Sequence, residues 1–124
     1  MKISDHLEKV GRFKNTLKKL DDEEDHETVV ELCVLIASHY VNAALHATGR
    51  LRQDKDIRHN RLEGFVRKEE CFGEASSRLA DLLGSLERLR PGQAYGRGRN
   101  GEVAKKAKEL CAEIGRICEG VIGD

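Results

Sequence analysis

Apolar residues recur at intervals of three and four along most of the chain, which is the spacing that lines one face of an α-helix. The first such segment predicts a helix over about 3–20, with Ile3, Leu7, Val10, Phe13, Leu17 and Leu20 on one face. The last covers about 101–121, where apolar residues follow in alternating steps of four and three. This average of 3.5 residues is typical of nearly antiparallel packed helices. No segment shows the alternation of a β-strand.

The segment from about 24 to 47 is apolar over most of its circumference. A helix of this kind must be covered on more than one side, so the pattern predicts a central helix or an interface helix. Gly49 can end this helix, and Asp54 or Asp56 can cap a third helix that runs to about Cys71. Gly73 permits a break before a fourth helix, which Pro91 and Gly92 stop.

These elements predict an all-α fold: an up-and-down four-helix bundle with a fifth short helical segment, in a single domain over residues 1–124. We see no uninterrupted apolar stretch of membrane-spanning length and no signal-peptide pattern, so we expect a cytoplasmic protein with no membrane partner. In a reducing cytosol the cysteines are expected to be free thiols, with disulfides as the alternative, at Cys33, Cys71, Cys111 and Cys118.

Charge is segregated along the chain although the 22 basic and 22 acidic residues cancel. Residues 21–27 carry six acids, residues 88–99 carry four arginines, and residues 49–61 carry five basic side chains. Solvated helix ends and loops are one interpretation of these blocks. Phosphate binding is another for the basic ones.

The motifs of metal and cofactor sites are absent or incomplete, so we expect no metal and no cofactor. GRGRNG at 96–101 has the glycine spacing of a dinucleotide-binding loop but follows no strand, although Arg97 and Arg99 beside a helix N-terminus could still hold a phosphate. The cysteines and histidines show neither CxxC nor HExxH spacing. Cys111 and Cys118 are expected in the core. His39 and His46 share a helix face and are expected to be half-buried or at an interface.

Arg52 and His59 form the candidate catalytic pair. A histidine can take the proton of a ribose hydroxyl or return one to the leaving oxygen, and an arginine can stabilise the charge that builds on the phosphate, without a metal. A helix that starts near His59 would add a favourable dipole for phosphate. Further positive potential would come from Arg50, Lys55, Arg58 and Arg61. The alternative interpretation is a solvated helix start.

Three stretches, SHYVNAALHATG, IRHNRLEGFV and LERLRPGQAYGRGRNGEVAKKAKEL, resemble in order and spacing the small prokaryotic HEPN proteins. The positions that fit this outline are Tyr40, Ala43, Ala44, His59, Phe65, Leu89, Arg90, Ala94, Tyr95, Ala104 and Ala107.

The resemblance implies a helical homodimer in which two histidine-bearing helix starts face a shared cleft. Many HEPN proteins are metal-independent ribonucleases marked by an arginine, four to six residues and a histidine, and some act as toxins; Arg52 and His59 meet that spacing at its upper limit. This chain departs from the motif by Gln53 after the arginine and by two intervening aspartates. The alternative is a non-catalytic nucleotide-binding or scaffold module that partners a separate minimal nucleotidyltransferase.

Overall fold

The computed structural model describes residues 1–70, 72–90 and 100–123, and this part of the chain contains helices and no strands. The helices are α1 (Ile3–Leu17), α2 (His26–Ala47), α3 (His59–Glu69), α4 (Ala75–Glu87) and α5 (Asn100–Ile122). The prediction of an all-α fold is confirmed. Cys71, Arg97 and Arg99 lie outside the described residues.

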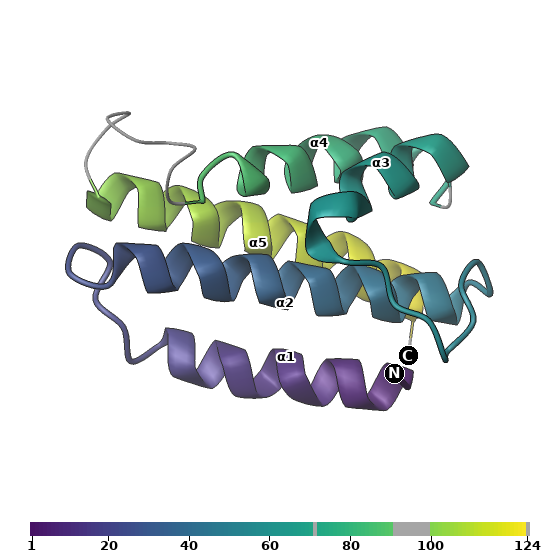
Figure 1. Ribbon diagram of the computed structural model, residues 1–124, viewed down its shortest axis with the longest axis horizontal. Helices are drawn as coiled ribbons and strands as arrows, with labels where there is room; N and C mark the ends of the chain where they lie inside the picture. The colour runs from purple at the N-terminus through teal and green to yellow at the C-terminus, as the bar shows by residue number, and fades with distance from the viewer. Residues whose placement is uncertain (71, 91–99, 124) are drawn as a thin grey trace.

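Helix α2 is the central element of the fold (Figure 1). It contacts each of the other four helices. Thirteen of its 22 residues are buried, among them Val29, Ile36, Val41 and Leu45. Most of the apolar circumference of α2 is therefore covered within one chain, with Leu35 left 39% exposed, which confirms a central helix.

Helix α1 lies along one side of α2, and α5 with the α3–α4 pair lies along the other (Figure 1). In the same view α1 and α4 run toward one end of the molecule, whereas α2 and α5 run toward the other. The two termini consequently lie at one end. The connection between α2 and α3 is at this end too.

By length and composition, α2 passes as a candidate membrane span, although sequence inspection for an uninterrupted apolar run did not single it out. Of its most apolar stretch, 67% is buried inside the fold. The core helix of a soluble protein has the same composition, so this finding is weak evidence for a membrane segment.

The start of α3 differs from the prediction. Neither Asp54 nor Asp56 caps the helix, which begins at His59 after Arg58 with no side-chain cap. Both carboxylates have other partners: Asp54 pairs with Arg52, and Asp56 accepts hydrogen bonds from two histidines. Each carboxylate is therefore bonded to other side chains, Asp54 to a neighbour on the same loop and Asp56 to residues of α1 and α2, and not to the amides of the first turn of α3.

Two of the predicted stops agree with the backbone, whereas Pro91 and Gly92 lie outside the described residues. Gly49 follows the end of α2 at a φ of 73°, and Gly73 separates α3 from α4 at a φ of 58°. Both are in the left-handed region, where glycine has no Cβ penalty. The three described cysteines, Cys33, Cys111 and Cys118, are buried free thiols, as expected.

Candidate functional site

The loop of residues 48–58, between α2 and α3, is held to α2 at both of its ends. At its start, the backbone amides of Arg50 and Leu51 donate to the Leu45 carbonyl oxygen. Near its end, the buried Asn42 side chain accepts from the Ile57 amide at 2.8 Å and donates to the Ile57 carbonyl at 3.0 Å. These contacts fix the position of Asp56 and of the first turn of α3.

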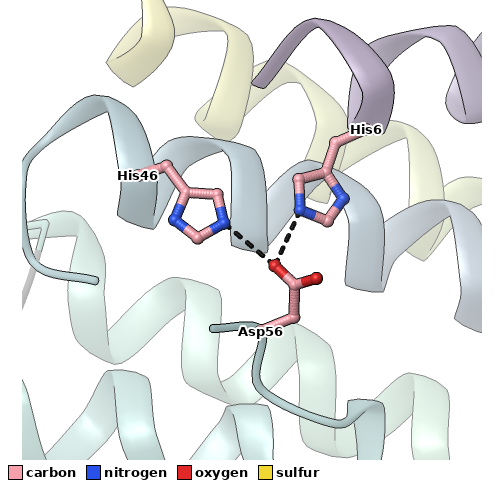
Figure 2. A group of neighbouring side chains, drawn as sticks. All are labelled: His6, His46 and Asp56. Atoms are coloured by element: carbon pink, nitrogen blue, oxygen red, sulfur yellow. Dashed lines mark hydrogen bonds and ion pairs between the residues drawn. The ribbon is translucent and has the colours of Figure 1, made fainter. Parts of the chain in front are cut away.

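Asp56 is the meeting point of two buried histidines (Figure 2). Its Oδ1 lies 2.9 Å from Nε2 of His6 on α1 and 2.9 Å from Nε2 of His46 on α2. The His6 and His46 side chains are 1% and 0% exposed, whereas Asp56 is 36% exposed. We call His6, His46 and Asp56 the histidine cluster.

The second ring nitrogen of each histidine and the second carboxylate oxygen of Asp56 also have polar partners. Nδ1 of His46 donates to the Leu51 carbonyl at 3.0 Å, and Nδ1 of His6 shares a proton with Nδ1 of His39 at 2.9 Å. The second carboxylate oxygen of Asp56 lies 3.3 Å from the Met1 amino group. The cluster thus joins α1, α2 and the loop of residues 48–58.

Burial sets the protonation preferences around the cluster. Desolvation, with the nearby His6 and Lys9, lowers the pKa of His39 to about 4. Desolvation also lowers the pKa of His6, because it outweighs the opposing hydrogen bond to Asp56. Burial alone would raise the pKa of Asp56, but the hydrogen bonds from His46 and His6 lower it. Asp56 is therefore a carboxylate, and His6 and His39 are neutral imidazoles at neutral pH.

A pocket of about 750 Å³ adjoins the cluster and extends along α3 as far as Lys68. Its lining consists of Asp56, Ile57, Arg58, Asn60, Arg61, Gly64, Phe65 and Lys68. Asp56 is the one acid among these residues, and three are cations. None of the three cations forms an ion pair with another residue that the structure describes. The pocket combines a positive potential with a helix start that no side chain caps, which suits a phosphate group.

The candidate catalytic pair lies beside this pocket but does not line it. Arg52 is 76% exposed and binds the Asp54 carboxylate through both Nε and Nη2. His59 is 32% exposed, and its Nδ1 lies 2.9 Å from Oε2 of Glu87 on α4. In the described part of the chain no hydrogen bond joins Arg52 to His59.

The other sequence-predicted cations are divided between the pocket and the surface. Arg58 and Arg61 line the pocket, whereas Arg50 and Lys55 are exposed on the loop outside it. At the start of α5, the Gly101 amide donates to Oε2 of Glu23 at 2.9 Å. An acid from the 21–27 run therefore occupies one of the amides that the sequence suggested for phosphate.

The sequence analysis missed the histidine cluster, although one signal pointed to it. His6 stands three residues after Ile3 and four before Val10, on the apolar face of the first helix. A polar side chain at such a position needs a buried partner. His46 shares a face with His39 in the same way. The pattern could not show that the partner of both histidines is Asp56.

A second polar group, in which Tyr40 is buried and Lys14 and Glu119 are exposed, joins α1, α2 and α5. Lys14 donates to the Tyr40 hydroxyl at 2.6 Å, and that hydroxyl donates to Oε2 of Glu119 at 2.9 Å. Burial and the bond to Glu119 raise the pKa of Tyr40 against the opposing effect of Lys14. This chain of bonds satisfies its own members, so we assign it to stability.

Comparisons of this chain with protein-family models, with curated proteins and with solved structures find no match to any of them.

Proposed function

We propose that this protein binds a phosphate ester, as a nucleotide or as RNA, in the pocket along α3. The observation that carries the proposal is the lining itself: Arg58, Arg61 and Lys68 have no described ion-pair partner and surround a pocket of about 750 Å³. Unpaired cations at one concave surface are held there against mutual repulsion, and an anion relieves that cost.

The remaining lining residues suit the rest of such a ligand. Phe65 offers an aromatic face on which a base can stack, Asn60 offers both a donor and an acceptor, and Gly64 leaves the backbone approachable. A volume of about 750 Å³ falls within the usual range for small-molecule sites. We infer binding without turnover as the primary activity, because the lining contains no general base beyond Asp56.

Metal-independent RNA cleavage by Arg52 and His59 is the second candidate function. The observation in its favour is the pair formed by His59 and Glu87, since a carboxylate that holds Nδ1 leaves Nε2 as the ring atom that exchanges protons. For cleavage, Arg52 would have to leave Asp54 and turn toward the scissile phosphate. The exposure of Arg52 permits that movement.

An HEPN-like up-and-down bundle remains our proposal for the fold family. The order of the helices supports it: two antiparallel pairs, α1 with α2 and α4 with α5, flank the short α3 that begins at a histidine. The homodimer, the toxin role and the nucleotidyltransferase partner stay predictions.

The test of the proposed function is binding of AMP, inorganic phosphate and a short single-stranded oligoribonucleotide, measured by calorimetry with the intact chain. We expect Arg61→Ala to weaken binding by roughly tenfold, because a charge-assisted hydrogen bond contributes about 1.5–3 kcal/mol. Arg12→Ala, an exposed arginine on α1, is the matched control. AMP binding without oligonucleotide preference indicates a nucleotide site, and the reverse indicates RNA. An equal loss of affinity in both variants, or no binding of any probe, excludes the pocket as the phosphate-binding site.

A further inference from the structure

We propose that the histidine cluster is a binding site for a divalent transition-metal ion, with Nε2 of His6, Nε2 of His46 and Oδ1 of Asp56 as ligands. Zn²⁺ is the ion that we assign first. The site stands at the end of the bundle where α1, α2 and the loop of residues 48–58 meet, and it does not depend on the proposed nucleotide site.

The first argument is convergence. Figure 2 shows the two imidazole edges turned toward the same carboxylate oxygen, 2.9 Å from each nitrogen. The three candidate ligand atoms all lie within 4.8 Å of one another. Ligands of a tetrahedral zinc ion are separated by about 3.3 Å, given metal–ligand distances near 2.0–2.1 Å. The two oxygen–nitrogen distances need to open by only a few tenths of an ångström to admit the ion, and the two nitrogen atoms, which lie within 4.8 Å of each other, would come to about the same separation.

The second argument is a count of protons. The Leu51 carbonyl can only accept, so Nδ1 of His46 carries a hydrogen. Nε2 of a neutral His46 would then present a lone pair to the carboxylate oxygen 2.9 Å away, which is repulsive. A hydrogen on either atom, or a metal ion, must therefore stand between them. On metal binding the hydrogen between His46 and Asp56 would leave to solvent, that of His6 would move from Nε2 to Nδ1, and nitrogen–metal bonds would take their places.

The third argument is the arrangement behind the ligands. Metal-binding histidines usually donate their other ring N–H to an oxygen or another acceptor, which fixes the tautomer and the ring orientation. Leu51 does this for His46, and Nδ1 of His39 can accept in this way from His6. The Leu51 carbonyl is thus in place before any ion binds, and His39 becomes the acceptor once His6 carries its hydrogen on Nδ1.

The ligand set also indicates the kind of site. Two imidazoles and one carboxylate suit Zn²⁺ and its neighbours in the first transition row better than Ca²⁺ or Mg²⁺, which prefer oxygen. Three protein ligands leave one coordination position for water or a bound molecule. Asp56 also lines the pocket along α3, so the ion would stand at the wall of that pocket.

The test is titration of the tag-free, EDTA-dialysed protein with Zn²⁺ and with Co²⁺ alone. We expect one ion per chain and a Co²⁺ spectrum without a thiolate charge-transfer band, since buried cysteines elsewhere in the core would produce one. In ¹⁵N spectra of the imidazoles, Zn²⁺ should shift Nε2 of His6 and His46 while both Nδ1 atoms carry a hydrogen. Absence of stoichiometric binding, or a thiolate band, overturns the proposal.

Two variants of the same loop complete the test. Asp56→Asn keeps the side-chain volume and is expected to weaken Zn²⁺ binding by roughly tenfold or more, because it removes a charged ligand. Asp54→Asn, two residues away and paired only with Arg52, should bind as the unaltered protein does. Circular dichroism establishes that each variant is folded. Equal affinity in both folded variants would overturn the assignment of Asp56, and shifts confined to other histidines in the ¹⁵N spectra would overturn the site.

Discussion

The ring of Tyr40 on α2 lies against the backbone of Gly115 on α5. A Cβ at position 115 would come 3.0 Å from Cε2 of Tyr40, whose hydroxyl is held by Lys14 and Glu119. The ring therefore cannot move aside without loss of those bonds. The close approach of α2 and α5 depends on the missing side chain at this position.

This contact predicts opposite outcomes for two helical glycines. Gly84→Ala on α4 would meet only the mobile carboxylate of Glu63, so the better helix propensity of alanine should stabilise the protein by up to about 1 kcal/mol. Gly115→Ala should instead destabilise it by about 1–3 kcal/mol through overpacking. Urea denaturation of the two variants measures both. A stabilised Gly115→Ala would mean that Tyr40 moves freely.

The same tyrosine predicts a loss of stability at alkaline pH. The pKa of Tyr40 is raised in the folded protein, chiefly by burial, so above about pH 10 the unfolded chain loses this proton first and unfolding is favoured. Burial lowers the pKa of Lys14, but the hydrogen bond to Tyr40 and the charge of Glu119 outweigh burial, so the pKa is raised overall. The stability that Lys14 contributes is therefore also lost at high pH. Tyr40→Phe should flatten the decline of the urea midpoint between pH 9 and 11. An unchanged decline would contradict this account.

Asn42 predicts a link between the core and the loop. Its replacement by alanine removes both hydrogen bonds to Ile57 and leaves a buried amide and carbonyl unpaired, at a cost of about 2 kcal/mol or more. The loop of residues 48–58 should then move more, and AMP binding should weaken although Asn42 does not line the pocket. Hydrogen exchange at Ile57 with calorimetry on Asn42→Ala measures both effects. Unaltered exchange at Ile57 would show that the loop is held elsewhere.

Zn²⁺ should strengthen phosphate binding if both proposed sites exist. The ion would neutralise Asp56, the one acid of the pocket lining, and add positive charge at its wall. A change of one unit charge at about 4 Å is worth about 1 kcal/mol in water and more at a protein surface, so AMP affinity should rise roughly fivefold or more. Asp56→Asn should remove this dependence on Zn²⁺. If Zn²⁺ leaves the affinity for AMP unchanged, the two sites are not coupled and this prediction is wrong.

RNA cleavage has its own test. Incubation of the protein with RNA in EDTA should give products if Arg52 and His59 are catalytic, and His59→Ala should abolish them. Glu87→Gln should lower the rate and shift its pH dependence, because the carboxylate that holds Nδ1 loses its charge. Equal cleavage by unaltered protein and His59→Ala would exclude His59 from the reaction. No cleavage by either leaves binding as the function.

The helices were predictable because their apolar spacing is a local property of the sequence. The spacing of apolar residues by three and four positions, as from Ile3 to Val10, predicts α1. The broad apolar surface of α2 predicts that this helix is covered on several sides and is central in the fold. The start of α3 was mispredicted because the two aspartates that were expected to cap it are bonded to other side chains. Asp54 and Asp56 look like caps in sequence, but their strongest partners, Arg52 and two histidines, compete with the backbone amides that a cap would bind.

The histidine cluster was beyond sequence reasoning for a related reason. His6 and Asp56 are separated by 50 positions and meet only when α1 has packed on α2. Short motifs such as CxxC are recognisable because one turn or one loop brings the ligands together. A site assembled from two helices and a loop has no fixed spacing. Only the polar residue on an apolar helix face marks it in advance.

Among the described helices, α2 is the one whose backbone lies close to that of α1. Helix α1 can therefore detach in a local opening that leaves the remainder folded, at a lower free energy than global unfolding. An ion bound by His6 on α1 and by His46 and Asp56 on the rest of the fold would tie α1 to the bundle and raise the free energy of this local opening. The protection of the backbone amides of residues 1–17 from hydrogen exchange would then measure how much of the protein carries the ion.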